Sequence, residues 1–218
     1  MKRYAVFGAS GCGRGILPLV RRQLIESASG SWDLVFVDDS PAAPVVNGHR
    51  VLRYEQWLDE PAEARWITIA IANSRVRERL ARRCQSDSVG FLDVRASNVV
   101  VMDDVHIGPG AVLSPFVTVT SNVRIGRHFQ ANLYSYVEHD CVIGDYVTFA
   151  PSVHCNGNVT VEDHAYIGAG AILRQGKPGH PLVIGRGAVV GMGAVVTRSV
   201  PPGETVVGNP ARPMAARA

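Results

Sequence analysis

A six-residue repeat between residues 101 and 173 constrains this chain more than any other feature. An apolar residue, mostly aliphatic, occupies every sixth position without a slip, and a second small or aliphatic residue follows four positions later. Glycine, aspartate, proline and asparagine, which favour turns, lie between them. Helical and strand side chains repeat at other periods, whereas this period is typical of a hexapeptide solenoid. We therefore predict a parallel β-helix in which three hexapeptides make one triangular coil and stacked coils share one core. The repeating positions are Val101, Ile107, Leu113, Val119, Ile125, Ala131, Val137, Ile143, Phe149, Cys155, Val161, Ile167 and Leu173.

The register of the repeat breaks once, after Leu173. The next clear hexapeptide begins at Ile184, so we expect residues 174–181 to leave the coil as an exposed loop. The pattern then resumes, and we expect Pro201, Pro202 and Gly203 to end it, with residues 206–211 beyond as a tail. Solenoid ends need caps. The segment before the repeat and this tail are placed to supply them.

Residues 1–90 have the pattern of a small α/β domain. An apolar strand at residues 4–7 leads into a glycine-rich loop at 8–15 and an apolar helix, and a second strand at 34–37 ends in Asp38 and Asp39. This order is a βαβ unit, which favours a parallel sheet. A further strand at 66–71 precedes Asn73, the expected N-cap of another helix. We place the α/β domain at 1–90, and the β-helix with its C-terminal tail at 91–218.

The glycine loop has three interpretations. Its glycines, at 8, 11, 13 and 15, do not have the GxGxxG spacing of dinucleotide folds, although Asp38 imitates their ribose-binding acid. Glycines let a backbone approach a ligand, and a helix N-terminus offers unpaired N–H groups to phosphate. This favours a nucleotide or nucleotide-sugar diphosphate over NAD. The remaining alternative is a loop that only turns the chain tightly.

Composition argues against several other classes of partner. The chain has 22 Lys and Arg residues against 19 Asp and Glu, with no dense basic run, which does not favour nucleic acid. No apolar stretch is long enough to span a bilayer, and the N-terminus lacks a signal peptide. We expect a cytoplasmic protein without a membrane partner. The four cysteines have no metal spacing. His128 and His164 should lie two coils apart, roughly 10 Å at ~4.8 Å per strand, so we expect no metal.

His139 is the candidate for proton-transfer chemistry. It lies between Glu138 and Asp140 at an expected coil corner, where side chains point outward. A carboxylate beside an imidazole fixes its tautomer and makes it a better proton acceptor. A general base needs this when an amine or hydroxyl attacks a thioester. The alternative is a solvated histidine that has acids beside it by chance.

Motifs along nearly the whole chain match a known family. They are Gly8-Ala9-Ser10-Gly11, Val37-Asp38-Asp39, the segments 69–73 and 139–145, and Gly208-Asn209-Pro210-Ala211. On these motifs the chain resembles the bacterial nucleotide-sugar acyltransferases of the hexapeptide-repeat superfamily, which have a sugar-nucleotide domain before a left-handed β-helix. The resemblance implies a homotrimer with acetyl-CoA lying along the solenoid between subunits. It implies His139 as the base and Asp140 as the group that tunes it. It further implies that Ser10, Gly11 and Cys12 hold the pyrophosphate, that Asp38, Asp39 and Ala72 contact the base and ribose, and that Thr148, Ala169 and Met192 contact CoA.

The leading hypothesis is an N-acetyltransferase that moves acetyl from acetyl-CoA to the amine of a nucleotide-linked amino sugar. The sugar is of the 4-amino-4,6-dideoxy type, for surface polysaccharide or glycan biosynthesis, and a backbone N–H near Gly157 stabilises the oxyanion. One alternative is O-acetylation of a sugar hydroxyl, including a sialic acid. Others are a non-catalytic nucleotide-sugar scaffold and a carbonic-anhydrase-like metalloenzyme. The sequence does not distinguish UDP, GDP and dTDP, or name the position acylated.

Overall fold

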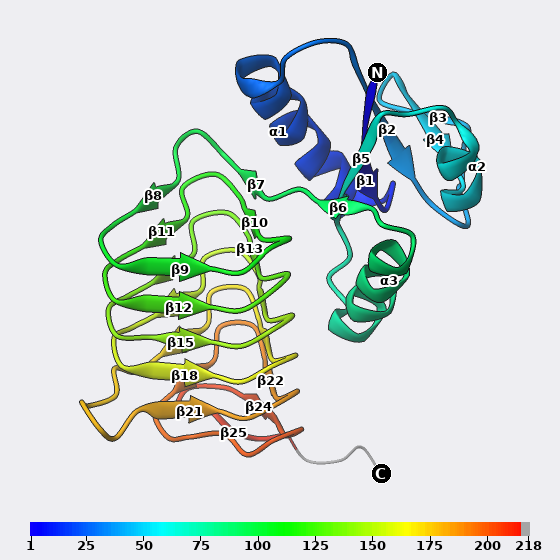
Figure 1. The fold of residues 1–218 in the computed structure, drawn as a ribbon. Coiled ribbons are helices and arrows are strands. Elements are labelled where there is room, and N and C mark those ends of the chain that lie inside the picture. Colours follow the sequence, from blue (N-terminus) through cyan, green and yellow to red (C-terminus); the bar gives the residue numbers. More distant parts are fainter. Residues whose placement is uncertain (215–218) are drawn as a thin grey trace. The chain divides into compact units, whose positions relative to one another are not determined.

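A computed structural model describes residues 1–214, which fall into two compact units (Figure 1). The first unit is Met1–Arg95 and the second begins at Ala96. No helix among the described residues has both the length and the apolar character needed to cross a membrane.

The first unit is a parallel sheet with helices, as the sequence predicts. Its strand order is β3-β4-β2-β1-β5-β6, and only the β3–β4 pair is antiparallel. The central strand β1 therefore has β2 on one side and β5 on the other. The strands of this sheet are β1 (Lys2–Phe7), β2 (Trp32–Val37), β3 (Val45–Val46), β4 (His49–Leu52), β5 (Ala64–Ile69) and β6 (Gly90–Phe91), and the helices are α1 (Gly11–Ser27), α2 (Tyr54–Asp59) and α3 (Ser74–Ser86). β7 (Val94–Arg95) follows and belongs to a different sheet.

Two local features of this unit differ from the prediction. β5 ends at Ile69, short of residue 71, and the chain then turns into the α3 N-cap. The segment 45–48 contains a turn, with Asn47 and Gly48 at φ 49° and 78°. It also pairs β3 with β4, because two positive φ values in succession match the twist of a hairpin. A two-residue strand is too short to show an alternating pattern.

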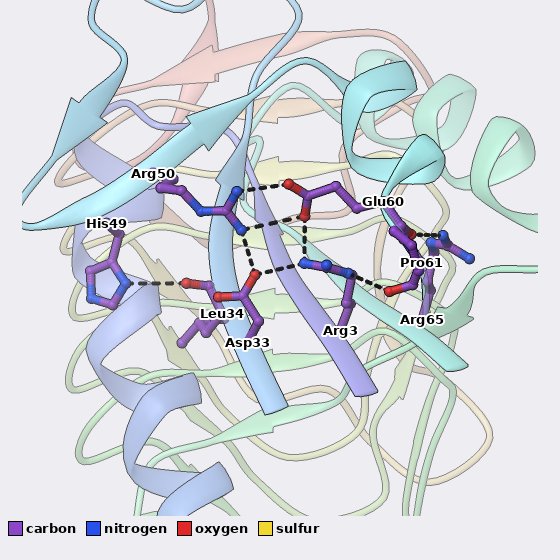
Figure 2. A network of polar contacts seen from close by, with 8 residues as sticks. All are labelled: Arg3, Asp33, Leu34, His49, Arg50, Glu60, Pro61 and Arg65. Carbon is purple, nitrogen blue, oxygen red and sulfur yellow. Dashed lines mark hydrogen bonds and ion pairs between the residues drawn. The ribbon is translucent and has the colours of Figure 1, made fainter. Parts of the chain in front are cut away.

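An ionic cluster joins the amino-terminal ends of β1 and β2 to the chain that follows α2 (Figure 2). Arg3 Nη1 donates to Asp33 Oδ2 at 2.9 Å, and Arg50 bridges Asp33 at 2.6 Å and Glu60 at 2.7 Å. Arg3 also pairs with Glu60, and its Nε donates to the Pro61 carbonyl at 2.9 Å. The hydrogen bond from Arg50 holds the pKa of Glu60 below its usual value, aided by the charge of Arg3. The cluster holds together the amino-terminal ends of the strands, at the end of the sheet opposite the glycine loop.

The second unit is the predicted left-handed β-helix, whose short parallel strands stack on three faces (Figure 1). Positions of the hexapeptide repeat, such as Val137, Ile143 and Cys155, point inward and are buried. The first face contains β10 (Val112–Leu113), β13 (Gln130–Ala131), β16 (Thr148–Phe149), β19 (Tyr166–Ile167), β22 (Val189–Val190) and β24 (Thr205–Val207). The second face is β8 (Val100–Val101), β11 (Thr118–Val119), β14 (Tyr136–Val137), β17 (His154–Cys155), β20 (Ile172–Leu173) and β23 (Val195–Val196). The third face is β9 (Val105–Ile107), β12 (Val123–Ile125), β15 (Val142–Ile143), β18 (Val159–Val161) and β21 (Leu182–Ile184).

The coils turn at corners where non-glycine residues have positive φ. Between the second and third faces these residues are Asp104, Asn122, Asp140 and Asn158, at φ 51°, 60°, 58° and 56°. Asparagine and aspartate visit this region more readily than other non-glycine residues. We call the column of turns between these two faces the His139 corner, because His139 lies in it.

The expectation that Pro201, Pro202 and Gly203 end the coil is wrong. β24 lies beyond them and pairs in parallel with β22, with Val206 opposite Val190 and buried. Paired residues of complete coils, such as Val119 and Val137, are 18 apart, whereas Val190 and Val206 are 16 apart, so the shorter coil hides the period. β25 (Arg212–Pro213) then turns back antiparallel to β24.

His128 and His164 lie on either side of Tyr146 in one column of buried rings. The ring centroids are 5.2 Å and 5.3 Å from that of Tyr146, with nearly parallel planes. The two histidines are thus packed as aromatic rings in the column of turns between the third and first faces. Residues 174–181 form the predicted loop between β20 and β21, at the His139 corner.

Candidate active site

Loops after β1, β2 and β5 meet at the carboxyl edge of the first sheet. The Gly8 N–H donates to the Val37 carbonyl at 2.7 Å, and the Ala70 N–H donates to the Phe7 carbonyl at 2.8 Å. β2 lies on one side of β1 and β5 on the other, so the strand order reverses at β1. Ligands of open α/β sheets bind at such a point. The structure thus gathers most of the predicted nucleotide residues, Ser10, Gly11, Cys12, Asp38 and Ala72, on these loops and at the start of α1.

The start of α1 is open to a ligand. The backbone N–H groups of residues 11, 12 and 13 have no acceptor among residues 1–214, and the Ser10 hydroxyl makes no capping bond. Gly13 lets the helix lie against the loop, because a Cβ there would be 1.7 Å from the Gly8 carbonyl oxygen. A Cβ on Gly11 would meet no atom closer than 4.0 Å. One glycine therefore allows close packing and the other faces open space.

Asp38 and Asp39 both have partners within the chain. Asp38 accepts from the Ala9 N–H at 3.1 Å and from the Ser40 N–H at 3.0 Å, which ties the β2 loop to the glycine loop. Asp39 accepts from the Tyr54 N–H at 3.2 Å and pairs with Arg83 at 2.7 Å. Both carboxylates therefore hold the loops in place, and any contact with a nucleotide would be additional.

A buried arginine that the sequence analysis did not single out lies beneath these loops. Arg77 of α3 is fully buried and donates Nη1 to the carbonyls of Ile71 at 2.6 Å and Ala72 at 3.1 Å. Desolvation raises the pKa of the Cys12 thiol, and the positive charge of Arg77 opposes the rise. Arg77 therefore brings a cation toward the start of α1. The sequence hides it, because it is one of several arginines in α3.

His139 and Asp140 form a hydrogen-bonded pair on the solenoid. The distance from His139 Nδ1 to Asp140 Oδ2 is 2.7 Å, and about half of each side chain is exposed. This hydrogen bond is the first cause of a lowered pKa at Asp140, with a smaller effect from Asn122. The pair is thus a charged carboxylate holding one ring nitrogen, while Nε2 makes no hydrogen bond within residues 1–214.

Two further residues position this pair. Asn122, one coil earlier, donates Nδ2 to Asp140 Oδ1 at 3.3 Å. Gly157, one coil later, lies against the imidazole, because a Cβ there would be 2.5 Å from Cε1 and 2.6 Å from Nε2 of His139. Gly157 is buried, and its N–H has no acceptor among the described residues. Gly157 thus lies beside the ring, and the role of its N–H as an oxyanion donor stays a prediction.

The residues predicted to contact CoA lie at another corner. Ala169 and Met192 are exposed on successive turns between the first and second faces, and the Gly193 N–H donates to the Ala169 carbonyl at 2.8 Å. Thr148 is buried on β16 of the first face. In a single chain these residues and His139 are thus on opposite sides of the second face.

Comparisons with known proteins agree along the whole chain, although no family model matches it. It is 50% identical over 214 residues to the GDP-perosamine N-acetyltransferase of Escherichia coli O157:H7, covering 98% of this chain and 97% of that one. The chain belongs to the bacterial nucleotide-sugar N-acyltransferases. WeeI from Acinetobacter baumannii AYE superimposes with a TM-score of 0.94 at 53% identity, covering 98% of this chain and all of the other. The acetyltransferase domain of PglB from Neisseria gonorrhoeae FA1090, in complex with acetyl coenzyme A, gives 0.86 at 28%, covering 97% and 98%.

Membership settles the reaction that this N-acyltransferase performs. It is an acetyl-CoA-dependent N-acetyltransferase that acts on the amino group of a nucleotide-linked amino sugar, and acetyl-CoA is its co-substrate. The leading hypothesis from the sequence is confirmed in this form. The roles of individual residues are a separate question, for which the geometry above is the starting point.

Proposed function

We propose that His139 is the general base and that the substrate is a GDP-linked 4-amino-4,6-dideoxy sugar. The observation that carries the catalytic part is the Nδ1 contact with Asp140 at 2.7 Å, on a ring seated against Gly157. Asp140 as acceptor places the hydrogen on Nδ1, so Nε2 has its lone pair free. The 50% identity to a GDP-perosamine N-acetyltransferase supports GDP as the nucleotide.

In the proposed mechanism the neutral amine attacks the thioester carbonyl, and His139 Nε2 takes the proton that the nitrogen loses. The charge of Asp140 stabilises the imidazolium that forms. The Gly157 N–H donates to the oxyanion of the tetrahedral intermediate, where a preorganised donor has its largest effect. Collapse of the intermediate expels CoA as the thiolate, which the imidazolium can protonate. Every group in the scheme lies on adjacent coils of one corner.

At the first unit, the N–H groups of residues 11–13 and the Ser10 hydroxyl bind the diphosphate. The buried Arg77 adds positive charge beneath it, which suits an anion at a helix N-terminus. Asp38, Asp39 and Ala72 contact the ribose and base. The carboxylates keep lone pairs for this, since each oxygen accepts one hydrogen bond or ion pair from the chain.

The enzyme is a cytoplasmic homotrimer in this proposal. His139 and the CoA residues Ala169 and Met192 lie at different corners of one chain, so a CoA molecule that touches both must lie between two subunits. Apolar side chains exposed on the solenoid, among them Phe116, Tyr134 and Met192, support burial by another copy. Mixing a His139→Ala subunit with an Ala169→Trp subunit should restore activity, because some interfaces then contain neither change. No recovery in verified mixed trimers would place the whole site within one chain.

Cys12 offers a direct test of the nucleotide site. It is exposed, whereas Cys84, Cys141 and Cys155 are buried, so a thiol reagent should alkylate Cys12 first. GDP-sugar should slow this reaction, and UDP- and dTDP-sugars should do so only at higher concentration. Equal protection by all of them would remove the assignment of GDP. No protection by any would move the nucleotide away from α1.

A further inference from the structure

The loop of residues 174–181 has a defined conformation at the His139 corner, held by backbone hydrogen bonds. Lys177 and His180 exchange backbone hydrogen bonds of 3.0 Å and 2.9 Å, which close a short hairpin. The Gly176 N–H donates to the Gly157 carbonyl at 2.9 Å, and a Cβ on Gly176 would be 2.0 Å from the Asn158 carbonyl oxygen. The loop is therefore fastened to the coil whose Gly157 lies against the His139 ring.

A pocket of about 220 Å³ opens between this loop and the next turn of the corner. Its lining residues are Arg174, Gln175, Gly176, Lys177, His180, Pro181, Leu182 and Ser199. Arg198 lies next to the lining residue Ser199 and is exposed. The loop contains no aspartate or glutamate, and its cations Arg174 and Lys177 line the pocket together.

The cations of this pocket differ from other arginines of the solenoid. Arg124, Arg127 and Arg186 pair with Asp104, Asp145 and Asp163 at 3.0, 2.6 and 2.9 Å. Arg174 and Lys177, which line the pocket, have no ion-pair partner among residues 1–214, and neither has Arg198 beside it. A group of like charges without counter-charges is unfavourable unless an anion joins it.

We propose that this pocket binds the phosphates of acetyl-CoA. Acetyl-CoA is the co-substrate, and its phosphates are separated from the reacting thioester by the long pantetheine arm. The loop lies two coils from His139 at the same corner, roughly 10 Å along the axis at ~4.8 Å per strand. A thioester at His139 with its arm along the corner brings the phosphates to Arg174 and Lys177. This position rests on the proposed role of His139.

A second anion could occupy the pocket, because the diphosphate of the nucleotide sugar has the same chemistry. The two sources separate by kinetics. In the Arg174→Ala/Lys177→Ala enzyme we expect the KM for acetyl-CoA to rise by about tenfold or more, as charge-assisted hydrogen bonds are lost. The kcat and the KM for the nucleotide sugar should stay within about twofold. A rise confined to the nucleotide-sugar KM would assign the pocket to the other substrate and overturn the proposal.

Direct binding makes the test independent of catalysis. Titration calorimetry should show that the folded Arg174→Ala/Lys177→Ala enzyme binds CoA more weakly than the wild type. The affinity should fall by the same factor when both proteins also carry His139→Ala. If His139 is not the base, this binding result still stands. Arg186→Ala is the matched control, since it removes one solenoid cation that already has a carboxylate, and it should leave CoA affinity unchanged. Equal CoA affinity in the wild type and the double variant would overturn the proposal.

A comparison of CoA with 3′-dephospho-CoA identifies the phosphate. If the pocket holds the 3′-phosphate, the wild type should prefer CoA and the double variant should lose that preference. If it holds the pyrophosphate, both ligands should weaken by the same factor. Gly176→Ala, which displaces the loop without removing a charge, should weaken CoA in the same direction.

Discussion

The glycine loop and the His139 corner present polar groups to substrates in opposite ways. At the start of α1 the carboxylates Asp38 and Asp39 are bonded within the chain, and the groups left open are mainly backbone N–H groups. At the His139 corner most backbone N–H and C=O groups form hydrogen bonds between neighbouring coils, and the groups available to a substrate are mainly side chains. Binding a diphosphate needs donors and little chemistry, whereas proton transfer needs an ionisable side chain. The glycine loop therefore needs glycines that leave backbone N–H groups accessible, whereas Gly157 at the His139 corner leaves room for the imidazole.

The largest expected effect concerns the ionisable side chain. His139→Ala should lower kcat by roughly 10²–10⁴-fold, the usual contribution of a general base. The KM for acetyl-CoA should change little, because the proton moves only as the bond forms. Asp140, whose pKa is lowered first by its hydrogen bond to His139, stays charged at the neutral pH of the assay. Wild-type kcat in a folded His139→Ala enzyme would return the histidine to a solvated surface role.

Gly157→Ala should have the next largest effect, through the position of the ring. The new methyl carbon would lie 2.5 Å from Cε1 of His139, so the imidazole must move. A displacement of about 1 Å can cost on the order of 10² in rate, and steady-state kcat measures it. The His139→Ala/Gly157→Ala double variant is the control, because no further loss is expected once the ring is gone. A full additional loss in the double variant would mean that Gly157 acts independently of the imidazole.

The sequence predicts the solenoid well because its core is periodic. Inward residues six apart, such as Val137 and Ile143, identify the coil and its three faces, and they place His139 on an outward corner. The pairing of His139 with Asp140 also follows, because both belong to one turn. Asn122 does not follow, since its partner is 18 residues away and the contact exists only when coils stack. β24 was missed for a related reason, because its coil has a different length.

The glycine loop was less predictable, because similar glycines have different roles. Gly13→Ala should destabilise the protein by about 1–3 kcal/mol, the usual cost of overpacking, since its Cβ would collide with the Gly8 carbonyl. Gly11→Val should leave stability within about 0.5 kcal/mol and raise the nucleotide-sugar KM. Urea unfolding and steady-state kinetics separate the two outcomes. Gly15→Ala is the control for helix propensity, because nothing lies within 4 Å of its Cβ. Normal nucleotide-sugar affinity in Gly11→Val would move the site elsewhere.

Arg77 shows what a sequence cannot reveal about such a site. The sequence around Arg77 does not distinguish it from the other arginines of α3. Arg77 is buried only because the helix packs under the loop. The same holds for Asp38 and Asp39. Their place after β2 predicts a nucleotide contact, but the structure shows that both first serve the loops. Contacts between side chains of the same turn can thus be predicted from the sequence, whereas contacts between separate helices, strands or coils cannot.

The smallest expected effect concerns Asn122, which acts on the base through Asp140. Asn122→Gly keeps a residue that tolerates φ 60° and removes the amide that donates to Asp140 at 3.3 Å. Because this hydrogen bond is long and exposed to solvent, we expect only about a two- to threefold fall in kcat.

Asp104→Gly is the matched control for Asn122→Gly, because Asp104 occupies the same column at φ 51° and, among residues 1–214, forms an ion pair only with the exposed Arg124. It should leave kcat unchanged. In the Asp140→Asn background, Asn122→Gly should have no further effect on kcat, since the carboxylate it orients is gone. If Asn122→Gly lowers kcat equally in both backgrounds, the amide does not act through Asp140. The His139 corner would then resemble the glycine loop, where the backbone rather than a chain of side chains sets the site.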